Sequence, residues 1–184
     1  MSKQELQQAT KDASGVSYDE SLEAGNLSPT LYERIGDEGF RHLSQTFYDK
    51  VFLDKESQWF LNIFSSSTKS DAVENQYLFF VQSFGGPDLY RQKKGKYTRL
   101  VGRHANYNIG ANAAERWLYH MLATLEEHPQ LSHDEEATAA LKKYFAYTAH
   151  YIVVTMQYMR PDQVSVQFWT MGCAGGICNC SVNF

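Results

Sequence analysis

Residues 37–51 read Asp-Glu-Gly-Phe-Arg-His-Leu-Ser-Gln-Thr-Phe-Tyr-Asp-Lys-Val, and this stretch decides the fold class. Its apolar side chains recur every three to four residues, at Phe40, Leu43, Phe47 and Val51. That spacing puts them on one face of an α-helix, because a helix turns once in about 3.6 residues. Asp37 can cap the helix at its N-terminus. The stretch predicts an amphipathic helix with one buried face, and Tyr48 lies beside that face.

The same period returns in three later stretches: residues 72–84, 114–125 and 141–156. Thr68 and Asp71 precede the first of them in a looser form of the capping box, and Ser132 and Glu135 precede the last in its full form. Four substantial helices packed around one interior are therefore expected. This pattern is typical of an all-α fold.

The segments between these helices are predicted to be short or irregular. A short helix is expected over residues 28–36, with Ser28 as its cap and proline in its first turn. Residues 59–64 form an aromatic-rich bend. Residues 85–100 are rich in glycine and basic side chains and have no period, which predicts a loop. A brief, weakly helical segment follows over residues 100–104.

The two ends of the chain lie outside the helical pattern. Residues 1–27 form a polar segment without the apolar stretch of a secretory signal. Residues 161–184 lose the period and are expected to be a tail, with a weak strand signal over 164–169. The division expected is an extension (1–27), one domain (28–160) and a tail (161–184).

All three cysteines lie in the tail, at Cys173, Cys178 and Cys180. A disulfide between two of them would not cross-link the helical domain, so a reduced, cytoplasmic setting is expected. Their spacing is similar to part of a zinc ligand set, but a fourth nearby ligand is missing. Free thiols are therefore the preferred interpretation.

Composition excludes several partners. With 17 Lys and Arg against 21 Asp and Glu, the net charge is −4, which gives no reason to expect nucleic acid or an anionic membrane. No apolar stretch approaches the roughly 20 residues of a membrane span. Aromatic residues make up 14% of the chain, which suits a large core or a pocket for a flat ligand.

His104 is the first candidate for chemistry. It ends the segment that follows the basic loop, where one ring nitrogen could bind a metal while a carbonyl fixes the other. The residues alone also allow His104 to be a surface or helix-capping histidine. We interpret four others as surface or capping histidines: His42, His120, His128 and His133. His150 is interpreted as a core histidine.

A second candidate group is Tyr48, Gln76 and Trp117, each on or beside an apolar face of a different predicted helix. Buried polar groups need partners. The three side chains therefore form a mutual network or bind a polar ligand, or else Tyr48 and Trp117 are core aromatics that reach backbone carbonyls.

A series of short stretches follows one another in a recognisable order: Thr46-Phe47-Tyr48, Trp59-Phe60, Ile63-Phe64, Asn75-Gln76-Tyr77, Phe79-Phe80-Val81-Gln82, Phe84-Gly85-Gly86-Pro87, Leu89-Tyr90, Gly102-Arg103-His104 and Ala114-Glu115-Arg116-Trp117-Leu118. With them, residues 31–158 resemble the truncated (two-over-two) hemoglobins of group II, in their plant type. The resemblance implies a globin-like two-over-two helical sandwich that holds haem b.

The resemblance also implies roles for matching residues. His104 falls at the proximal ligand of the haem iron. The distal pocket is expected from Tyr48, Gln76, Trp117 and Ala72. Contacts with the haem or its propionates are expected from Phe64, Phe79, Phe80, Tyr90 and Arg103. The basic run over residues 91–99 is a solvated surface, a neighbour of the propionates, or a site for an acidic partner.

The function implied is binding of O2, NO or CO at a five-coordinate or weakly six-coordinate iron, for oxygen transport, storage or sensing. Tyr48 and Trp117 would stabilise the ligand dipole. An alternative is a haem enzyme for NO dioxygenation, nitrite reduction or peroxide turnover. It would need a separate reductase, because no flavin or nicotinamide motif is present. A haem-free helical interaction module is the third hypothesis. Monomer and homodimer both stay open.

Overall fold

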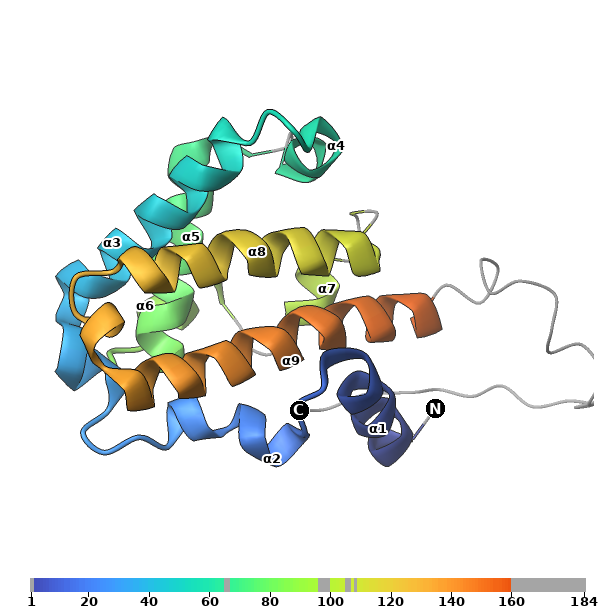
Figure 1. Cartoon of the computed structure of the whole chain (residues 1–184), viewed down its shortest axis with the longest axis horizontal. Helices are drawn as coiled ribbons and strands as arrows, with labels where there is room; N and C mark the ends of the chain where they lie inside the picture. The colour runs from blue at the N-terminus through green and yellow to red at the C-terminus, as the bar shows by residue number, and fades with distance from the viewer. Residues whose placement is uncertain (1, 65–66, 96–99, 105–106, 108, 160–184) are drawn as a thin grey trace, which may run out of the picture.

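A computed structural model describes residues 2–64, 67–95, 100–104, 107 and 109–159 of the chain (Figure 1). Every regular element in these ranges is helical, in agreement with the all-α prediction. The elements are α1 (Lys3–Ser14), α2 (Tyr18–Ser21), η1 (Glu23–Gly25), α3 (Leu31–Leu53), α4 (Gln58–Leu61), η2 (Asn62–Phe64), α5 (Lys69–Ser83), α6 (Leu89–Lys94), α7 (Leu100–His104), α8 (Ala111–Glu127), η3 (Leu131–His133) and α9 (Glu135–Met159). The cysteine tail and the weak strand signal at 164–169 lie outside the described residues.

The four long helices form two pairs around one interior. α3 packs against α5, and α8 runs antiparallel beside α9, while α3 also contacts α8 (Figure 1). This arrangement confirms the predicted globin-like sandwich. Its interior contains side chains with no more than 1% of their surface exposed, among them Phe40, Phe47, Met121, Leu125, Leu141 and Phe145. No helix in the described part of the chain is both long and apolar enough to cross a bilayer.

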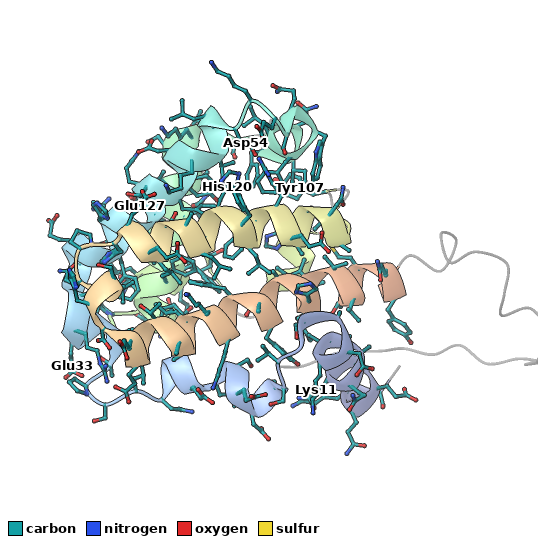
Figure 2. All side chains as sticks on the ribbon, viewed as in Figure 1. Lys11, Glu33, Asp54, Tyr107, His120 and Glu127 are labelled. Carbon is teal, nitrogen blue, oxygen red and sulfur yellow. The ribbon has the colours of Figure 1, made fainter. Side chains whose placement is uncertain are left out.

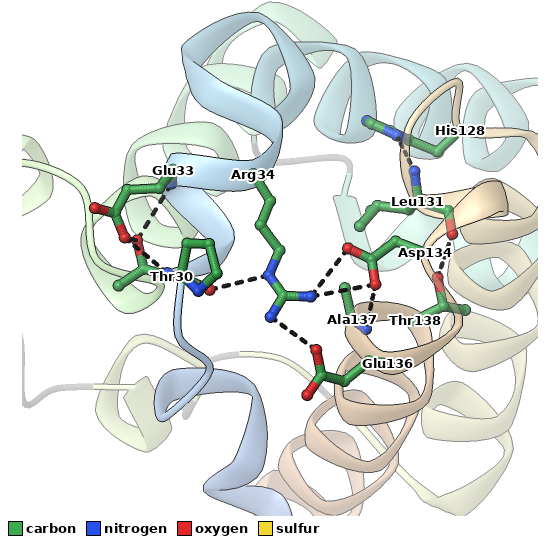
Figure 3. Close-up of polar contacts among 10 residues, drawn as sticks. Thr30, Glu33, Arg34, His128, Leu131, Asp134, Glu136, Ala137 and Thr138 are labelled. Carbon is green, nitrogen blue, oxygen red and sulfur yellow. Dashed lines mark hydrogen bonds and ion pairs between the residues drawn. The ribbon is translucent and has the colours of Figure 1, made fainter.

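Helix α3 confirms its predicted stripe, since the four apolar side chains are fully buried: Phe40, Leu43, Phe47 and Val51. The helix breaks at Gly36, where φ is +64°, a left-handed conformation that favours glycine. The predicted cap at Ser28 is wrong. Thr30 caps instead, because its hydroxyl accepts the Glu33 N–H at 3.2 Å while the Glu33 carboxylate accepts the Thr30 N–H at 2.8 Å (Figure 3).

The start of α9 also differs from the prediction. Asp134, rather than Ser132, caps this helix, because its carboxylate accepts the Ala137 N–H at 3.0 Å (Figure 3). Ser132 lies within the 3₁₀ turn η3, which separates it from the helix. The same Asp134 carboxylate and Glu136 bind Arg34 at 3.1 and 2.8 Å. The first turn of α3 is thereby joined to the first turn of α9.

The loop predicted over residues 85–100 is wrong in its middle part. Residues 89–94 form α6, in which Tyr90 is the buried side chain. A helix this short has no room for an apolar period, although its leucine, lysines and arginine favour helix. The segment predicted over residues 100–104 is helical, as α7.

The N-terminal segment packs on α9, on the side away from α8 (Figure 1). Thr10 is fully buried there, and the Tyr18 ring lies 6.0 Å from the Tyr147 ring. Lys143 binds the Glu23 carboxylate at 2.7 Å. The sequence had indicated only that this segment is polar, so its place against α9 is a finding of the structure.

Candidate functional site

The two helix pairs enclose a cavity of about 470 Å³. Its volume falls within the roughly 300–1,000 Å³ usual for ligand pockets. Side chains from α3, α4, α5, α6, α7, α8 and α9 and from the segments between them line it: Tyr48, Phe60, Ile63, Phe64, Ser67, Ala72, Asn75, Gln76, Phe79, Phe80, Tyr90, Lys94, His104, Tyr107, Ile109, Ala113, Ala114, Trp117, Tyr144, Phe145, Thr148, Ala149 and Ile152. Most are apolar or aromatic, which suits a flat hydrophobic ligand.

The structure brings almost all the predicted site residues together in this cavity. The candidate ligand His104 lines it, and so do the four candidates for the distal pocket, Tyr48, Gln76, Trp117 and Ala72. The predicted haem contacts Phe64, Phe79, Phe80 and Tyr90 line it as well. The side chain of Arg103 lies outside the described part of the structure, so its predicted role stays a prediction.

His104 is the one histidine among the described residues that line the cavity. It ends α7, which packs against α9, and its carbonyl accepts the Tyr107 N–H at 3.0 Å. The short helix α7 thereby places His104 at the cavity wall. A neutral imidazole is a good ligand for haem iron, so His104 fits a haem in this cavity.

Three other histidines make hydrogen bonds elsewhere. His120 and His128 are buried, so the surface interpretation is wrong for both, whereas His128 is the C-cap residue of α8, as the capping interpretation allows. His120 Nε2 lies 2.9 Å from the Asp54 carboxylate, and His128 Nε2 lies 2.9 Å from the Gly39 carbonyl. His150 Nδ1 lies 2.9 Å from the Ala146 carbonyl within α9.

Tyr48 is buried in a cluster of aromatic rings. Its ring meets that of Phe64 edge to face, with centroids 5.8 Å apart, and meets Phe47 at 4.9 Å. Burial, and to a lesser degree the nearby Tyr107 hydroxyl, raise the pKa of Tyr48 well above its ordinary value. The phenol therefore stays protonated and able to donate. Within the described residues its hydroxyl makes no hydrogen bond.

Gln76 and Trp117 present further polar atoms. The Oε1 atom of Gln76 is buried and has no partner in the described part of the chain. Trp117 packs its ring against Phe47 at 5.1 Å and Phe145 at 5.5 Å, and no described group accepts a hydrogen bond from its indole N–H. Of these three side chains, Gln76 is the one with a polar atom shown to be both buried and unpaired, which is uncommon among buried polar groups.

The sequence analysis missed several lining residues, Tyr107 and Lys94 among them. Tyr107 belongs to an aperiodic turn, which gives no local signal. Lys94 is part of the basic run; it is exposed, as a solvated surface would be, and it also lines the cavity. Phe60 lay in the predicted aromatic bend, and its burial, with 2% exposed, could have been expected from that bend.

Comparison with known proteins agrees with the fold. Residues 30–151 match the sequence model of the bacterial-like globin family. Two-on-two hemoglobin-3 of Arabidopsis thaliana is 40% identical over 150 residues, which cover 82% of each chain. Group 2 truncated hemoglobin 3-1 of Lotus japonicus is 36% identical over 154 residues, 84% of this chain and 88% of that protein.

Solved structures show the same similarity. The hemoglobin of the actinobacterium Thermobifida fusca has a TM-score of 0.59 at 33% identity, covering 67% of this chain and 96% of its own. The hemoglobin of Chloroflexus aurantiacus has a TM-score of 0.60 at 35% identity, covering 68% of this chain and 98% of its own. The chain belongs to the truncated hemoglobins of group II, and this family implies haem-based ligand binding.

Proposed function

We propose that this chain holds haem b through His104 and binds small diatomic gases such as O2, NO and CO. One observation supports this proposal above the others. A single cavity contains an imidazole and three polar side chains with an unpartnered atom among the described residues: Tyr48, Gln76 and Trp117. An imidazole suits an iron ligand, and the unpartnered atoms suit a small polar ligand.

Haem, when bound, supplies an iron to which a diatomic molecule can coordinate. The chain supplies the surroundings. The phenol of Tyr48 and the indole N–H of Trp117 can donate to the partial negative charge of such a ligand, and the low dielectric of the cavity strengthens both bonds. Ala72 is buried and carries only a methyl group, so it offers the iron no side-chain ligand. A five-coordinate or weakly six-coordinate iron is therefore part of the proposal.

Aromatic rings form much of the wall of the same space. Phe80 is buried, and Phe64 and Phe79 are partly buried against the core. We assign these three rings and Tyr90 to contact with the porphyrin, because flat apolar faces match its surface. Lys94 and Arg103 are the basic residues assigned to the propionates. The ligand would be transported, stored or sensed in the cytoplasm, a location that the cysteine-free core favours.

A visible spectrum of the protein reconstituted with hemin tests the proposal. The wild type should show a Soret band that shifts on reduction and again on adding CO. His104→Gly should lose the wild-type spectrum, and free imidazole should restore it. His133→Gly, which changes an exposed histidine in η3, is the matched control and should keep the wild-type spectrum. A colourless wild type, or His104→Gly with an unchanged spectrum, would overturn the assignment.

A haem enzyme is the second candidate function. The observation in its favour is that Tyr48 lines the cavity and keeps its proton, so its hydroxyl can orient a bound reactant through a hydrogen bond. NO dioxygenation and nitrite reduction would also need a separate reductase. NO consumption by the reconstituted protein, measured with and without an added electron donor, would distinguish turnover from simple binding.

A further inference from the structure

An ion-pair cluster lies where the end of α3 meets α8, with the side chains of Asp54 and His120 enclosed and that of Arg116 partly exposed. Arg116 donates to the Asp54 carboxylate through both Nε and Nη2 at 2.7 Å, and His120 Nε2 donates to it at 2.9 Å. A carboxylate only accepts, so Nε2 of His120 carries the proton. Figure 2 shows Asp54 and His120 close together in this corner. We name Asp54, Arg116 and His120 the corner cluster.

Asp54 is unusually well enclosed for an acidic side chain, with 3% of its side chain exposed. Its carboxylate also accepts the Glu56 N–H at 3.2 Å, which fixes the turn after α3. The hydrogen bonds from Arg116 and His120 hold the pKa of Asp54 well below its ordinary value. Exposed ion pairs stabilise a protein little, but removing one partner of an enclosed pair leaves a charge without compensation.

Two routes of direct contact lead from the corner cluster to the cavity. Along the first, the His120 ring stacks on Phe60 at 6.0 Å, Phe60 meets Phe64 at 5.3 Å, and Phe64 meets Tyr48 at 5.8 Å. Phe60, Phe64 and Tyr48 all line the cavity.

The second route runs along the two helices. Arg116 directly precedes Trp117 on α8, and the Trp117 ring lies 5.1 Å from Phe47, the neighbour of Tyr48 on α3. Asp54 therefore joins the end of the helix that carries one donor to the part of α8 that carries the other.

We infer that Asp54 is a positioning residue for the ligand site: by holding Arg116 and His120, it fixes where the Tyr48 hydroxyl and the Trp117 indole N–H lie relative to each other. This inference rests on the proposed function of those two donors. Hydrogen bonds weaken steeply when their geometry departs from the optimum. Loss of the corner cluster therefore weakens the hydrogen bonds from Tyr48 and Trp117 to the ligand, although neither donor is itself changed.

Asp54→Asn tests the inference, because it keeps the shape of the side chain and removes its charge. The control is Asp49→Asn, which breaks the exposed ion pair between Asp49 of α3 and Lys69 of α5. The O2 dissociation rate is measured by stopped flow in four proteins: wild type, Asp54→Asn, Asp49→Asn, and Asp54→Asn combined with Tyr48→Phe and Trp117→Phe. A parallel variant with only Tyr48→Phe and Trp117→Phe completes the cycle.

We expect Asp54→Asn to release O2 at least about twofold faster than the wild type, the lower end of coupling between residues in one network. Asp49→Asn should leave the rate unchanged. In the background without the two donors, Asp54→Asn should have no further effect. An unchanged rate in Asp54→Asn, or the same fold-change with and without the donors, would overturn the inference.

Amide hydrogen exchange on the haem-loaded protein gives a second readout that does not involve release. Exchange at the corner, over residues 58–64 and 116–120, should be faster in Asp54→Asn than in Asp49→Asn. Equal exchange in the two variants would contradict the inference.

Should Asp54→Asn fail to fold, Arg116→Lys serves in its place, since lysine keeps the charge but cannot make the bidentate interaction with the Asp54 carboxylate. It should give the same donor-dependent increase, and an unchanged rate would count against the inference. If removing both donors does not itself change release, the proposed function of Tyr48 and Trp117 fails. The exchange measurement then still decides whether Asp54 holds the corner.

Discussion

The imidazole of His128 and the carbonyl of Gly39 lie 2.9 Å apart, and this bond joins the turn between α8 and α9 to α3. The other ring nitrogen, Nδ1, accepts the N–H groups of Gln130 and Leu131 at 3.3 and 3.2 Å (Figure 3 shows the second). Nδ1 acts as an acceptor, so Nε2 carries the proton and donates to Gly39. A second proton on the fully buried ring would remove the acceptor that both N–H groups use.

This arrangement predicts a pH dependence of stability. Burial lowers the pKa of His128 below 6.5, with a smaller contribution from the charge of His42. The unfolded chain has an ordinary histidine and binds the proton more readily in the window below pH 6.5. The stabilising contribution is therefore complete above that pH and is lost as the pH falls toward the folded-state pKa.

Urea unfolding of the wild type between pH 7.5 and 5.5 should show the loss, with a slope of at most about 1.4 kcal/mol per pH unit from this one group. His128→Asn should be less stable at pH 7.5 and should have a shallower slope. His133→Asn, at an exposed histidine, should keep the wild-type slope. Equal slopes for the wild type and His128→Asn would show that another group titrates.

Replacing both distal donors should speed ligand release. Tyr48→Phe with Trp117→Phe removes two hydrogen-bond donors and keeps aromatic rings in the cavity. At about 0.5–1.5 kcal/mol for each lost bond, the O2 dissociation rate should rise at least about fivefold. Stopped-flow mixing of the oxygenated protein measures it. Tyr32→Phe, which removes a hydroxyl outside the cavity lining, is the control, and a double variant with the wild-type rate would refute the donor roles.

The sequence predicted the long helices well, because each buries one periodic stripe, as Phe47 and Val51 do on α3. Tyr48 and Trp117 were candidates because they are polar groups on or beside apolar helix faces, but their assignment to a distal pocket came from the resemblance to a family. Periodicity alone could not have assigned them, since core aromatics recur with the same spacing.

What the sequence did not predict depends on contacts between distant residues. Asp54 and Arg116 lie 62 positions apart, and neither has a local motif that indicates the other. The burial of His120 follows from the same pair of helices meeting at that corner. Helix α6 was predicted to be part of a loop for another reason, because six residues are too few to show a helical period.

Removing the N-terminal segment should destabilise the fold while sparing the site. On α9, the side chains Tyr144 and Thr148 line the cavity, whereas Tyr147 contacts Tyr18 on the other side of the helix. Tyr147 is 5% exposed, and burial raises its pKa to about 12. Deleting residues 2–27 would expose this ring and the apolar surface around it to water.

Since uncovering one large apolar side chain costs about 1.5–3 kcal/mol, we expect the deletion to lower the free energy of unfolding by about 3 kcal/mol. The O2 dissociation rate should change less than about twofold, because no residue of the deleted segment lines the described cavity. Urea unfolding and stopped flow on the haem-loaded protein measure the two effects. Lys143→Gln, which breaks only the half-exposed ion pair with Glu23, should lower stability far less. If the deletion instead left stability unchanged and altered release, the segment would act on the site rather than on the packing of α9.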